Sequence, residues 1–465
     1  MKLTLIGGGG VRSPLFVLTL LRRAQQIHLE ELCLMDIDAR KLALFGGLCG
    51  ELVRQAGSPF RVTTTQDPRQ AMHSARHVVT TIRVGFDRGR ALDERIALRR
   101  GVLGQETTGP GGFAMALRSI PALLGYAALL DELSPGAWMY NFTNPAGLVT
   151  QALVEAGFRR VVGICDGANA GQVSAAAWLN IPAHRLRAEV FGLNHLSWTR
   201  RIWQDAPGDR AVDVLPGLLA DPGFVRAMQS PFEPQLVAQI GMFLNEYLYY
   251  YYYAEKAVAA ISREARTRGE EIVELNERLL DRLEAIGVER DPQAALRAFF
   301  AYERRRSATY MNYARSDAPS MEEADHQAGA EVEGSPETGE GYAGVALDII
   351  AALETGIPLY TALNVPNNGA IAGMPDDDVV EVSCRVDRDG IQTLPIGEIP
   401  ALQRMLMQMI KFYEKQTVQA VQARSRKLAV EALMAHPLVI SYSRAAGLVD
   451  DYLADHAEYV GEWAD

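Results

Sequence analysis

The sequence predicts an α/β fold, in which a Rossmann-like doubly wound parallel sheet is followed by a mixed α+β part that is largely helical. Three observations support this prediction. The apolar run at 3–6 leads directly into four glycines and a helical pattern. Further apolar runs alternate with helical patterns up to about residue 185, which is typical of parallel strands joined by crossover helices. Beyond that point the alternation ends, so we expect two domains, 1–185 and 186–465.

The strand candidates of the first domain are short apolar runs. They are LTLI (3–6), ELCLMDID (31–38), FRVTTT (60–65), HVVTTIRV (77–84), AWMYNFTN (137–144) and RRVVGICD (159–166). Ligands of such sheets bind beyond the carboxyl ends of the strands. After residue 185, RAEVFGLNHLSWTRRIW alternates as in an antiparallel ribbon, and most of the remaining chain has helical patterns. The acidic segment 316–341 has few large apolar residues and is expected to be a surface loop.

The composition excludes several classes of function. At 465 residues the chain is longer than one core ordinarily supports, and a net charge of −11 argues against a duplex nucleic acid partner. Four cysteines without CxxC spacing indicate neither a zinc ribbon nor a disulfide framework. No apolar run approaches the length that spans a membrane. We therefore expect a cytoplasmic protein that acts on a small molecule, without nucleic acid or membrane partners.

The first strand–helix turn carries a dinucleotide-binding signal. Gly7, Gly8, Gly9 and Gly10 lie where glycines let a pyrophosphate approach the backbone, although a tight turn without a ligand is the alternative. Asp36 closes the second strand run, where a carboxylate accepts hydrogen bonds from ribose hydroxyls. The combination of a strand, a glycine turn and a helix predicts that the first domain binds a dinucleotide. The carboxylate of Asp36 favours NAD over a 2′-phosphorylated cofactor.

A loop and a pair of soft ligands suggest the rest of the site. GQETTGPGGF (104–113) combines glycines, hydroxyls and a carboxylate, which suits a substrate with many hydroxyls. Cys165 and His195 could each be ordinary core residues, but Cys165 and Asp166 follow the carboxyl end of a strand. One thiolate and one imidazole leave a metal shell incomplete, so substrate or water oxygens would complete it. By softness alone these ligands favour zinc or iron.

Other polar residues have two interpretations. In NFTNP, Asn141 or Asn144 either caps the next helix or faces the cleft, and both roles are compatible. Arg83 and Arg90 flank GFDRG and are either solvated charges or site residues. Six tyrosines lie within 247–253, where helical spacing prevents them from sharing one face. At most one or two of these tyrosines can be functional.

These motifs, in this order, resemble glycoside hydrolase family 4, the NAD-dependent glycosidases. The resemblance runs from residue 1 to about 440 and is carried by LIGGGG, RALDE, GQETTGPGGF, ALRSIP, NFTNPAG, GICD, GLNHLSW, EYLYYYY and NVPNNGAIAGMP. Within the family, GQETTGPGGF and NFTNPAG are most similar to the 6-phospho-β-glucosidases. The resemblance implies NAD, a divalent metal that is usually manganese, a sugar phosphate substrate, and a homodimer or homotetramer.

The resemblance also implies residue roles. Cys165 and His195 would ligate the metal, while Asp166 would donate a proton. Tyr247 would be the base, with its pKa lowered by the metal. The remaining assignments are Arg90, Asn144 and Arg306 for the substrate, and Gly7, Gly8, Gly9, Gly10, Asp36 and Arg83 for the cofactor.

The implied reaction is an exception to the two-carboxylate scheme of glycoside hydrolysis. NAD⁺ oxidises carbon 3 of the sugar, the proton on carbon 2 becomes acidic, the aglycone is eliminated, water adds and the hydride returns. Alternatives within the family are a non-phosphorylated, 6-phospho-galacto- or α-glycoside substrate. Two further alternatives are an NAD-dependent sugar dehydrogenase with net oxidation and a non-catalytic NAD or sugar-phosphate sensor.

Overall fold

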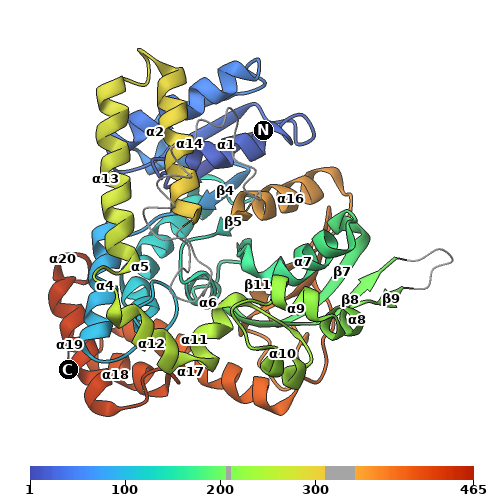
Figure 1. Cartoon of the computed structure of the whole chain (residues 1–465). Helices are drawn as coiled ribbons and strands as arrows, with labels where there is room; N and C mark the ends of the chain where they lie inside the picture. The colour runs from blue at the N-terminus through green and yellow to red at the C-terminus, as the bar shows by residue number, and fades with distance from the viewer. Residues whose placement is uncertain (206–210, 309–340, 465) are drawn as a thin grey trace.

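The main sheet begins with six parallel strands. The computed structural model describes residues 1–205, 211–308 and 341–464 (Figure 1). The strands are β1 (Lys2–Ile6), β2 (Glu31–Met35), β3 (Arg61–Thr65), β4 (His77–Thr80), β5 (Trp138–Asn141) and β6 (Val161–Gly163). They are ordered β3-β2-β1-β4-β5-β6, and each of the six predicted runs overlaps one of them. This is the Rossmann order, which places a ligand crevice beside β1 and β4, where the strand order reverses.

Helices cover both faces of this sheet. They are α1 (Ser13–Leu21), α2 (Ala39–Gln55), α3 (Pro68–Met72), α4 (Phe86–Arg99), α5 (Pro110–Leu133), α6 (Ala146–Glu155) and α7 (Ala170–Leu179). Asp38 caps α2 by accepting a hydrogen bond from the backbone N–H of Lys41. Leu3, Leu5 and Ile6 of β1 are fully buried, because a parallel strand covered on both faces has no solvent side.

The second half of the chain adds three strands to the same sheet. β11 (Leu359–Pro366) pairs antiparallel with β6, and β12 (Val379–Asp387) and β13 (Gly390–Thr393) follow it outward. The predicted mixed α+β, largely helical second part is confirmed, although these three strands were not predicted individually. Apolar residues of both halves also form one continuous core. The division into 1–185 and 186–465 stays a prediction.

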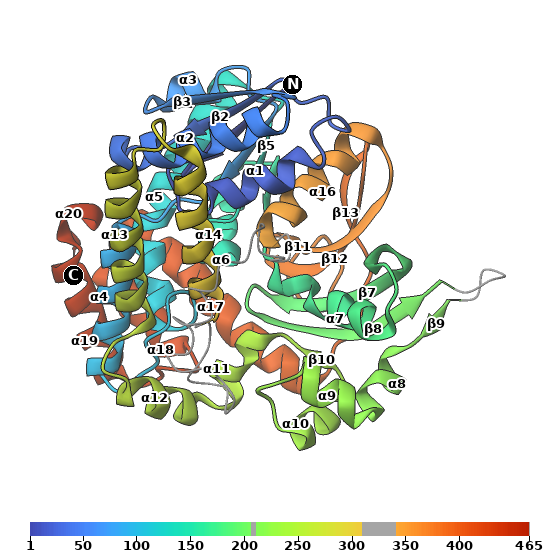
Figure 2. The ribbon, with the colours of Figure 1, turned by 45° about the horizontal axis from the view of Figure 1, so that its top comes forward.

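A smaller antiparallel sheet carries part of the site. β7 (Leu186–Leu193) and β8 (Leu196–Gln204) form the predicted ribbon, with β9 (Val212–Asp213) and β10 (Phe243–Leu244) paired to β8. Figure 2 shows this ribbon projecting from the body of the molecule toward β9. The hydroxyl of Ser383 on β12 accepts a hydrogen bond from the Val190 N–H and donates to the Ala188 carbonyl, which ties the ribbon to the main sheet.

Helices make up most of the remaining chain. They are α8 (Leu215–Ala220), α9 (Pro222–Met228), α10 (Pro234–Ile240), α11 (Tyr249–Tyr252), α12 (Ala254–Arg263), α13 (Arg268–Ile286), α14 (Pro292–Ala308), α16 (Gly341–Thr355), α17 (Ala401–Ala423), α18 (Arg426–Ala435), α19 (Tyr442–Asp455) and α20 (Ala457–Val460). Short 3₁₀ turns occur at Gly167–Asn169, Ala183–Arg185 and Glu246–Leu248. The expected acidic surface loop lies, up to residue 340, outside the described residues.

Helix α5 corrects the expectation that no apolar run is long enough to span a membrane. Among the described residues it is the helix whose length and composition meet that criterion, with a mean hydropathy of 1.6. However, 61% of its apolar window is buried inside the protein, and Pro121 lies within it. A long apolar helix packed against a sheet satisfies the same test, so α5 is a core helix.

Candidate active site

One large cavity brings most of the predicted site residues together. Its volume is about 2020 Å³, more than one small ligand requires. The predicted residues that line it are Arg83, Arg90, Asn144, Cys165, Asp166, His195, Tyr247 and Arg306. They come from strand ends of the main sheet, from α4 and α14, and from the β7–β8 turn. The cavity therefore combines residues of both halves of the chain.

The glycine turn does not line this cavity but packs tightly beside β2. A Cβ atom on Gly8 would lie 2.7 Å from the Cβ of Leu34, and Gly7 has a φ of 93°. The N–H of Gly9 donates to Asp36 Oδ2 at 2.9 Å, and burial raises the pKa of Asp36. The turn thus requires glycines for its own packing and also places a buried carboxylate beside the start of α1. This geometry fits a dinucleotide, whose contacts with Gly7–Gly10 and Asp36 stay a prediction.

A hydrogen-bond chain sets the state of the His195 ring. The Thr107 hydroxyl donates to Gln105 Oε1 at 3.2 Å and lies 3.0 Å from His195 Nδ1. With the hydroxyl donating to Gln105, its oxygen accepts from His195 Nδ1–H, which is the tautomer that leaves Nε2 unprotonated. Nε2 then keeps its lone pair, and it has no hydrogen-bond partner among the described residues.

His195 itself has a neutral, oriented ring. Burial lowers its pKa to about 4, so the imidazole is neutral at pH 7. It lies at the β7–β8 turn with a φ of 62°, and its ring stacks on Tyr247, with centroids 3.8 Å apart and planes inclined by 3°. A neutral imidazole with a free lone pair is the form that ligates metals. The stack places the phenol of Tyr247 beside that ligand.

Cys165 and Asp166 follow β6 at the same end of the sheet. Cys165 is buried, and burial, Glu381 and Asp166 raise the pKa of its thiol. Asp166 is exposed and lines the cavity. No group of three or more His, Cys, Asp and Glu residues that could hold a metal is found in the described ranges. The predicted metal site at Cys165 and His195, completed by substrate or water oxygens, stays a prediction.

Glu381 is a buried carboxylate that the sequence analysis missed. It lies on β12, and its Oε1 accepts from Asn194 and Asn364 at 3.3 and 3.0 Å. Burial raises the pKa of Glu381 to about 7, although hydrogen bonds from Ser197, Asn364 and Asn194 lower it. Glu381 thus ties β12 to the residue that precedes His195. VVEVSC resembles a buried strand, and a lone glutamate in it was the available signal.

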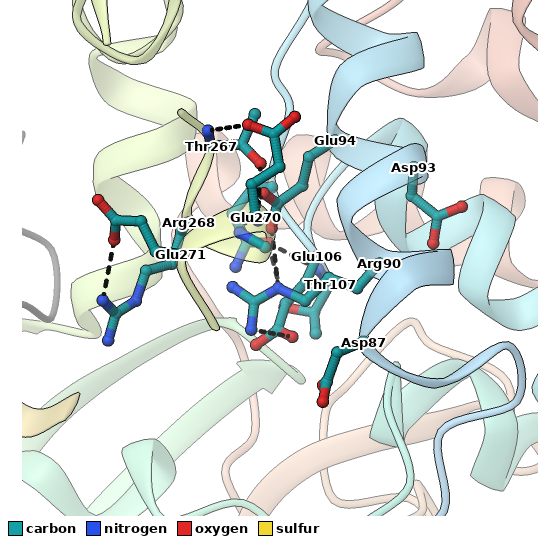
Figure 3. Close-up of polar contacts among 12 residues, drawn as sticks. Asp87, Arg90, Asp93, Glu94, Glu106, Thr107, Thr267, Arg268, Glu270 and Glu271 are labelled. Carbon is teal, nitrogen blue, oxygen red and sulfur yellow. Dashed lines mark hydrogen bonds and ion pairs between the residues drawn. The ribbon is translucent and has the colours of Figure 1, made fainter. Parts of the chain in front are cut away.

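The arginines flanking GFDRG lie in the cavity and are not solvated charges. Arg83 and Arg90 both form ion pairs with Glu106 Oε2, at 2.8 and 2.9 Å. Burial alone would raise the pKa of Glu106, but Arg90 and Arg83 outweigh it and lower that pKa to about 2. Figure 3 shows Arg90 directed at Glu106, with Glu94 on the other side. Glu106 and Glu94 therefore hold Arg90 in a fixed orientation.

Helix α13 brings a further arginine beside Arg90. Glu94 accepts from Arg90 Nε and from the N–H of Gly269, and a Cβ on Gly269 would lie 2.8 Å from the Cα of Ala91. The missing side chain lets α13 approach α4, so Arg268 lines the cavity across from Arg90 (Figure 3). The sequence analysis missed Arg268, because its position depends on this helix contact.

Arg268 and Arg306 are also linked to each other. Arg268 Nη2 donates to the carbonyl of Arg306 at 2.7 Å, and Arg306 Nη1 donates to the Tyr302 hydroxyl at 2.7 Å. Burial lowers the pKa of Arg268, and the positive charges of Arg306 and Arg90 lower it further. Arg268 also forms an ion pair with Glu271 at 3.1 Å, so the cavity holds three guanidinium groups beside carboxylates of the chain.

The asparagines and tyrosines separate into structural and cavity residues. Asn141 Nδ2 donates to the Ala146 carbonyl in the first turn of α6, whereas Asn144 lines the cavity. Of the tyrosines, Tyr247 and Tyr250 line the cavity. The others pack elsewhere, as with Tyr252, whose hydroxyl accepts from the Trp198 indole N–H. Which of these two tyrosines is functional stays a prediction.

Comparison with known proteins identifies the family. A model of the family 4 glycosyl hydrolases matches residues 2–180, and a model of the C-terminal domain of that family matches residues 190–439. The chain belongs to glycosyl hydrolase family 4. Both the fold class and the family predicted from the motifs are confirmed, and the chain is a glycosidase of the 6-phosphoglucosidase group.

Individual relatives agree with this assignment. The chain is 30% identical over 472 residues to a probable 6-phospho-β-glucosidase of Bacillus subtilis, covering 100% of this chain and 98% of the relative. It is 28% identical to a 6-phospho-α-glucosidase of Lacticaseibacillus paracasei, covering 97% and 96%. The 6-phospho-β-glucosidase structure of Thermotoga maritima with manganese, NAD⁺ and glucose-6-phosphate has a TM-score of 0.82, 26% identity and full coverage of both chains.

Proposed function

We propose that this glycosidase hydrolyses 6-phospho-β-glucosides with NAD and a divalent cation, Mn²⁺, as cofactors. The observation that carries the proposal is the arrangement of Cys165, His195 and Tyr247 around one cavity, with the His195 ring stacked on Tyr247. The matched relative of Bacillus subtilis and the Thermotoga maritima structure both carry the β-glucosidase name. These names support the β anomer, and the relative named for the α anomer is the alternative.

The residues present fit both cofactors. The glycine turn beside Asp36 suits a dinucleotide, and Cys165 with the lone pair of His195 Nε2 suits a divalent cation. When bound, NAD supplies reversible oxidation at carbon 3 of the sugar, and the cation supplies the Lewis acidity that makes the neighbouring hydrogen acidic.

The side chains of this protein then move two protons. Tyr247, as a phenolate whose pKa a bound cation would lower, takes the proton from carbon 2 of the sugar and becomes the neutral phenol. The carboxyl group of Asp166, exposed to the cavity, gives a proton to the glycosidic oxygen as the aglycone leaves. Arg90 is held by Glu94 and Glu106, so it can orient the sugar without a further entropic cost.

The guanidinium cluster of Arg90, Arg268 and Arg306 is the proposed subsite for the 6-phosphate. Arg306 was assigned to the substrate by resemblance, and its position in the cavity beside Arg268 supports that assignment. A phosphate there would accept charge-assisted hydrogen bonds and offset the repulsion between the guanidinium groups.

Removing the positive charge of Arg306 should reduce activity toward phosphorylated substrates more than toward plain ones. We expect Arg306→Met to raise the KM of a chromogenic 6-phospho-β-glucoside by about 10- to 100-fold, which is the worth of one hydrogen bond to a charged group. Activity toward the plain glucoside should change less than threefold. Arg305→Met is the matched control, since Arg305 lies on the same helix but does not line the cavity. An equal loss on both substrates would contradict a phosphate role.

Thr107 should affect metal binding through His195. We expect Thr107→Val to weaken Mn²⁺ affinity about 10- to 100-fold, measured by electron paramagnetic resonance, because the ring loses the acceptor that fixes its tautomer. Thr107→Ser should restore it. Thr108→Val is the control, because the buried Thr108 hydroxyl has no hydrogen-bond partner among the described residues. Unchanged Mn²⁺ affinity in Thr107→Val would refute this role.

A substrate screen tests the function itself. Chromogenic glucosides and galactosides, α and β, with and without a 6-phosphate, are incubated with NAD⁺, Mn²⁺ and a reductant, each present or omitted. We expect cleavage of the 6-phospho-β-glucoside only with all three additions and no accumulation of NADH. NADH formed in step with product would indicate a sugar dehydrogenase, and cofactor binding without turnover would indicate a sensor.

A further inference from the structure

Glu303 is a buried carboxylate of the cavity that the proposed mechanism does not use. It lies on α14, three residues before Arg306, is 2% exposed and lines the cavity. Its Oε1 has no hydrogen-bond partner among the described residues. A carboxylate oxygen that is removed from water without a partner destabilises the fold, so one that persists in a native structure calls for a function. Glu303 therefore offers a hydrogen-bond acceptor to a ligand of the cavity.

The charges near Glu303 place it beside both halves of the site. Burial raises the pKa of Glu303, although the positive charges of Arg12 and Arg306 lower it. Arg12 ends the glycine turn and is the N-cap of α1, and Figures 1 and 2 both show α14 beside α1. Arg306 belongs to the proposed phosphate subsite. Glu303 is therefore close to the proposed cofactor turn and to the proposed phosphate subsite.

The ligand group that suits this carboxylate is a hydroxyl. An ionised carboxylate only accepts hydrogen bonds and it repels a phosphate, so its partner has to be an uncharged donor. Residues three positions apart on a helix have Cβ atoms about 5–6 Å apart. A sugar whose phosphate contacts Arg306 therefore brings the ring atoms nearest the phosphorylated carbon to Glu303.

The proposed reaction leaves one hydroxyl of the sugar without a partner. Asp166 acts on the glycosidic oxygen at carbon 1, and carbons 2 and 3 react with the base and the cofactors. The guanidinium cluster takes the phosphate on carbon 6, and the ring oxygen carries no hydrogen. The hydroxyl on carbon 4 remains, and it is the ring hydroxyl nearest the phosphorylated carbon. An unpartnered acceptor of the protein and an unassigned donor of the sugar thus fall on the same side of the phosphate subsite.

We propose that Glu303 accepts a hydrogen bond from the hydroxyl on carbon 4 of the sugar and thereby selects gluco- over galacto-configured substrates. In the galacto epimer this hydroxyl leaves the ring in a different direction, so Glu303 does not reach it in the same pose. The inference rests on the proposed function, because the phosphate at Arg306 places the sugar. Glu303 binds substrate in this role and transfers no proton.

A substrate that lacks this hydroxyl tests the contact in a double-mutant cycle. For the wild type, we expect kcat/KM to be about 10- to 100-fold lower on a 4-deoxy-6-phospho-β-glucoside than on its parent, the worth of one hydrogen bond to a charged group. Glu303→Met should lose the same factor on the parent but less than threefold on the analogue, because the contact is already absent there. Glu303→Gln keeps an acceptor oxygen and should recover most of the parent activity.

The galacto epimer provides a second measurement. The preference of the wild type for the 6-phospho-β-glucoside over the 6-phospho-β-galactoside should fall about 10- to 100-fold in Glu303→Met. Glu264→Met is the matched control, because Glu264 also lines the cavity but its side chain is exposed, and it should leave both substrate ratios unchanged. Without ligands, the melting temperature of Glu303→Met should stay the same or rise, since an unpartnered buried carboxylate is removed.

Three results would overturn the proposal. Equal losses on the parent and the 4-deoxy substrate, with a lowered melting temperature, would give Glu303 a structural role only. Weaker NAD⁺ binding with an unchanged 4-deoxy ratio would assign its acceptor to a ribose hydroxyl of the cofactor. Loss of activity in Glu303→Gln as large as in Glu303→Met would indicate proton transfer. A wild type that does not cleave the 6-phospho-β-glucoside would instead overturn the proposed function, and this inference with it.

Discussion

The Cys165→Ser variant is expected to lose at least about a thousandfold in kcat/KM on the 6-phospho-β-glucoside, together with most of its Mn²⁺ affinity. A serine hydroxyl stays protonated and neutral, whereas the thiol of Cys165 would lose its proton on binding a divalent cation and become an anionic ligand. Loss of Lewis-acid stabilisation of about 4 kcal/mol corresponds to that factor. The measurements are steady-state kinetics and Mn²⁺ binding by electron paramagnetic resonance.

Cys49→Ser is the matched control for this experiment. Cys49 lies on α2, is fully buried and does not line the cavity, so its variant repeats the thiol-to-hydroxyl change in a core position. We expect it to keep full Mn²⁺ affinity and nearly full activity, with at most a lowered melting temperature. Full activity of Cys165→Ser would contradict metal binding by Cys165. Equal losses in both variants would indicate that the substitutions act through folding.

The second large effect is expected for Tyr247→Phe. This change keeps the ring that stacks on His195 and removes only the phenolic oxygen. We expect kcat to fall by about 10²- to 10⁴-fold, the range for loss of a general base, while KM and Mn²⁺ affinity change little. In heavy water the wild type should place deuterium at carbon 2 of the sugar, and the variant should do so at a rate reduced in proportion to kcat, as followed by NMR.

Tyr250 distinguishes the two tyrosines that line the cavity. Its ring centroid lies 5.9 Å from that of Tyr247, so both phenols lie near the site. Tyr250→Phe should retain kcat within about threefold, because His195 stacks on Tyr247 and not on Tyr250. A larger loss in Tyr250→Phe than in Tyr247→Phe would move the base to Tyr250. Product without deuterium from the wild type would contradict proton removal at carbon 2.

The parallel half of the fold could be predicted because its signals are local. Each of the six strands is a short apolar run followed by polar residues and a helix, and burial on both faces makes such runs nearly continuous. The same rule placed Asn144, Cys165 and Asp166 at the carboxyl ends of strands, and all three line the cavity. The antiparallel strands β11, β12 and β13 were missed, because pairing of β11 with β6 joins segments about 200 residues apart.

Some site contacts have no sequence signature. Thr107 lies 88 residues from His195, and only the folded chain shows that its hydroxyl determines the tautomer of that ring. In the sequence, Arg268 is one of many arginines in helical segments. Its place in the cavity follows from Gly269, which lets α13 approach α4. Such contacts depend on how two surfaces pack, and the local sequence around each residue does not predict them.

The sequence by itself determined the parallel sheet, the glycine turn and the family, and it predicted the catalytic side chains, because these are encoded in runs and motifs of twelve residues or fewer. Only the tertiary structure decided which arginines converge, that Thr107 lies beside the His195 ring, and that this ring stacks on Tyr247. Those outcomes depend on packing between segments distant in the chain, where burial and hydrogen-bond geometry are set by the whole fold.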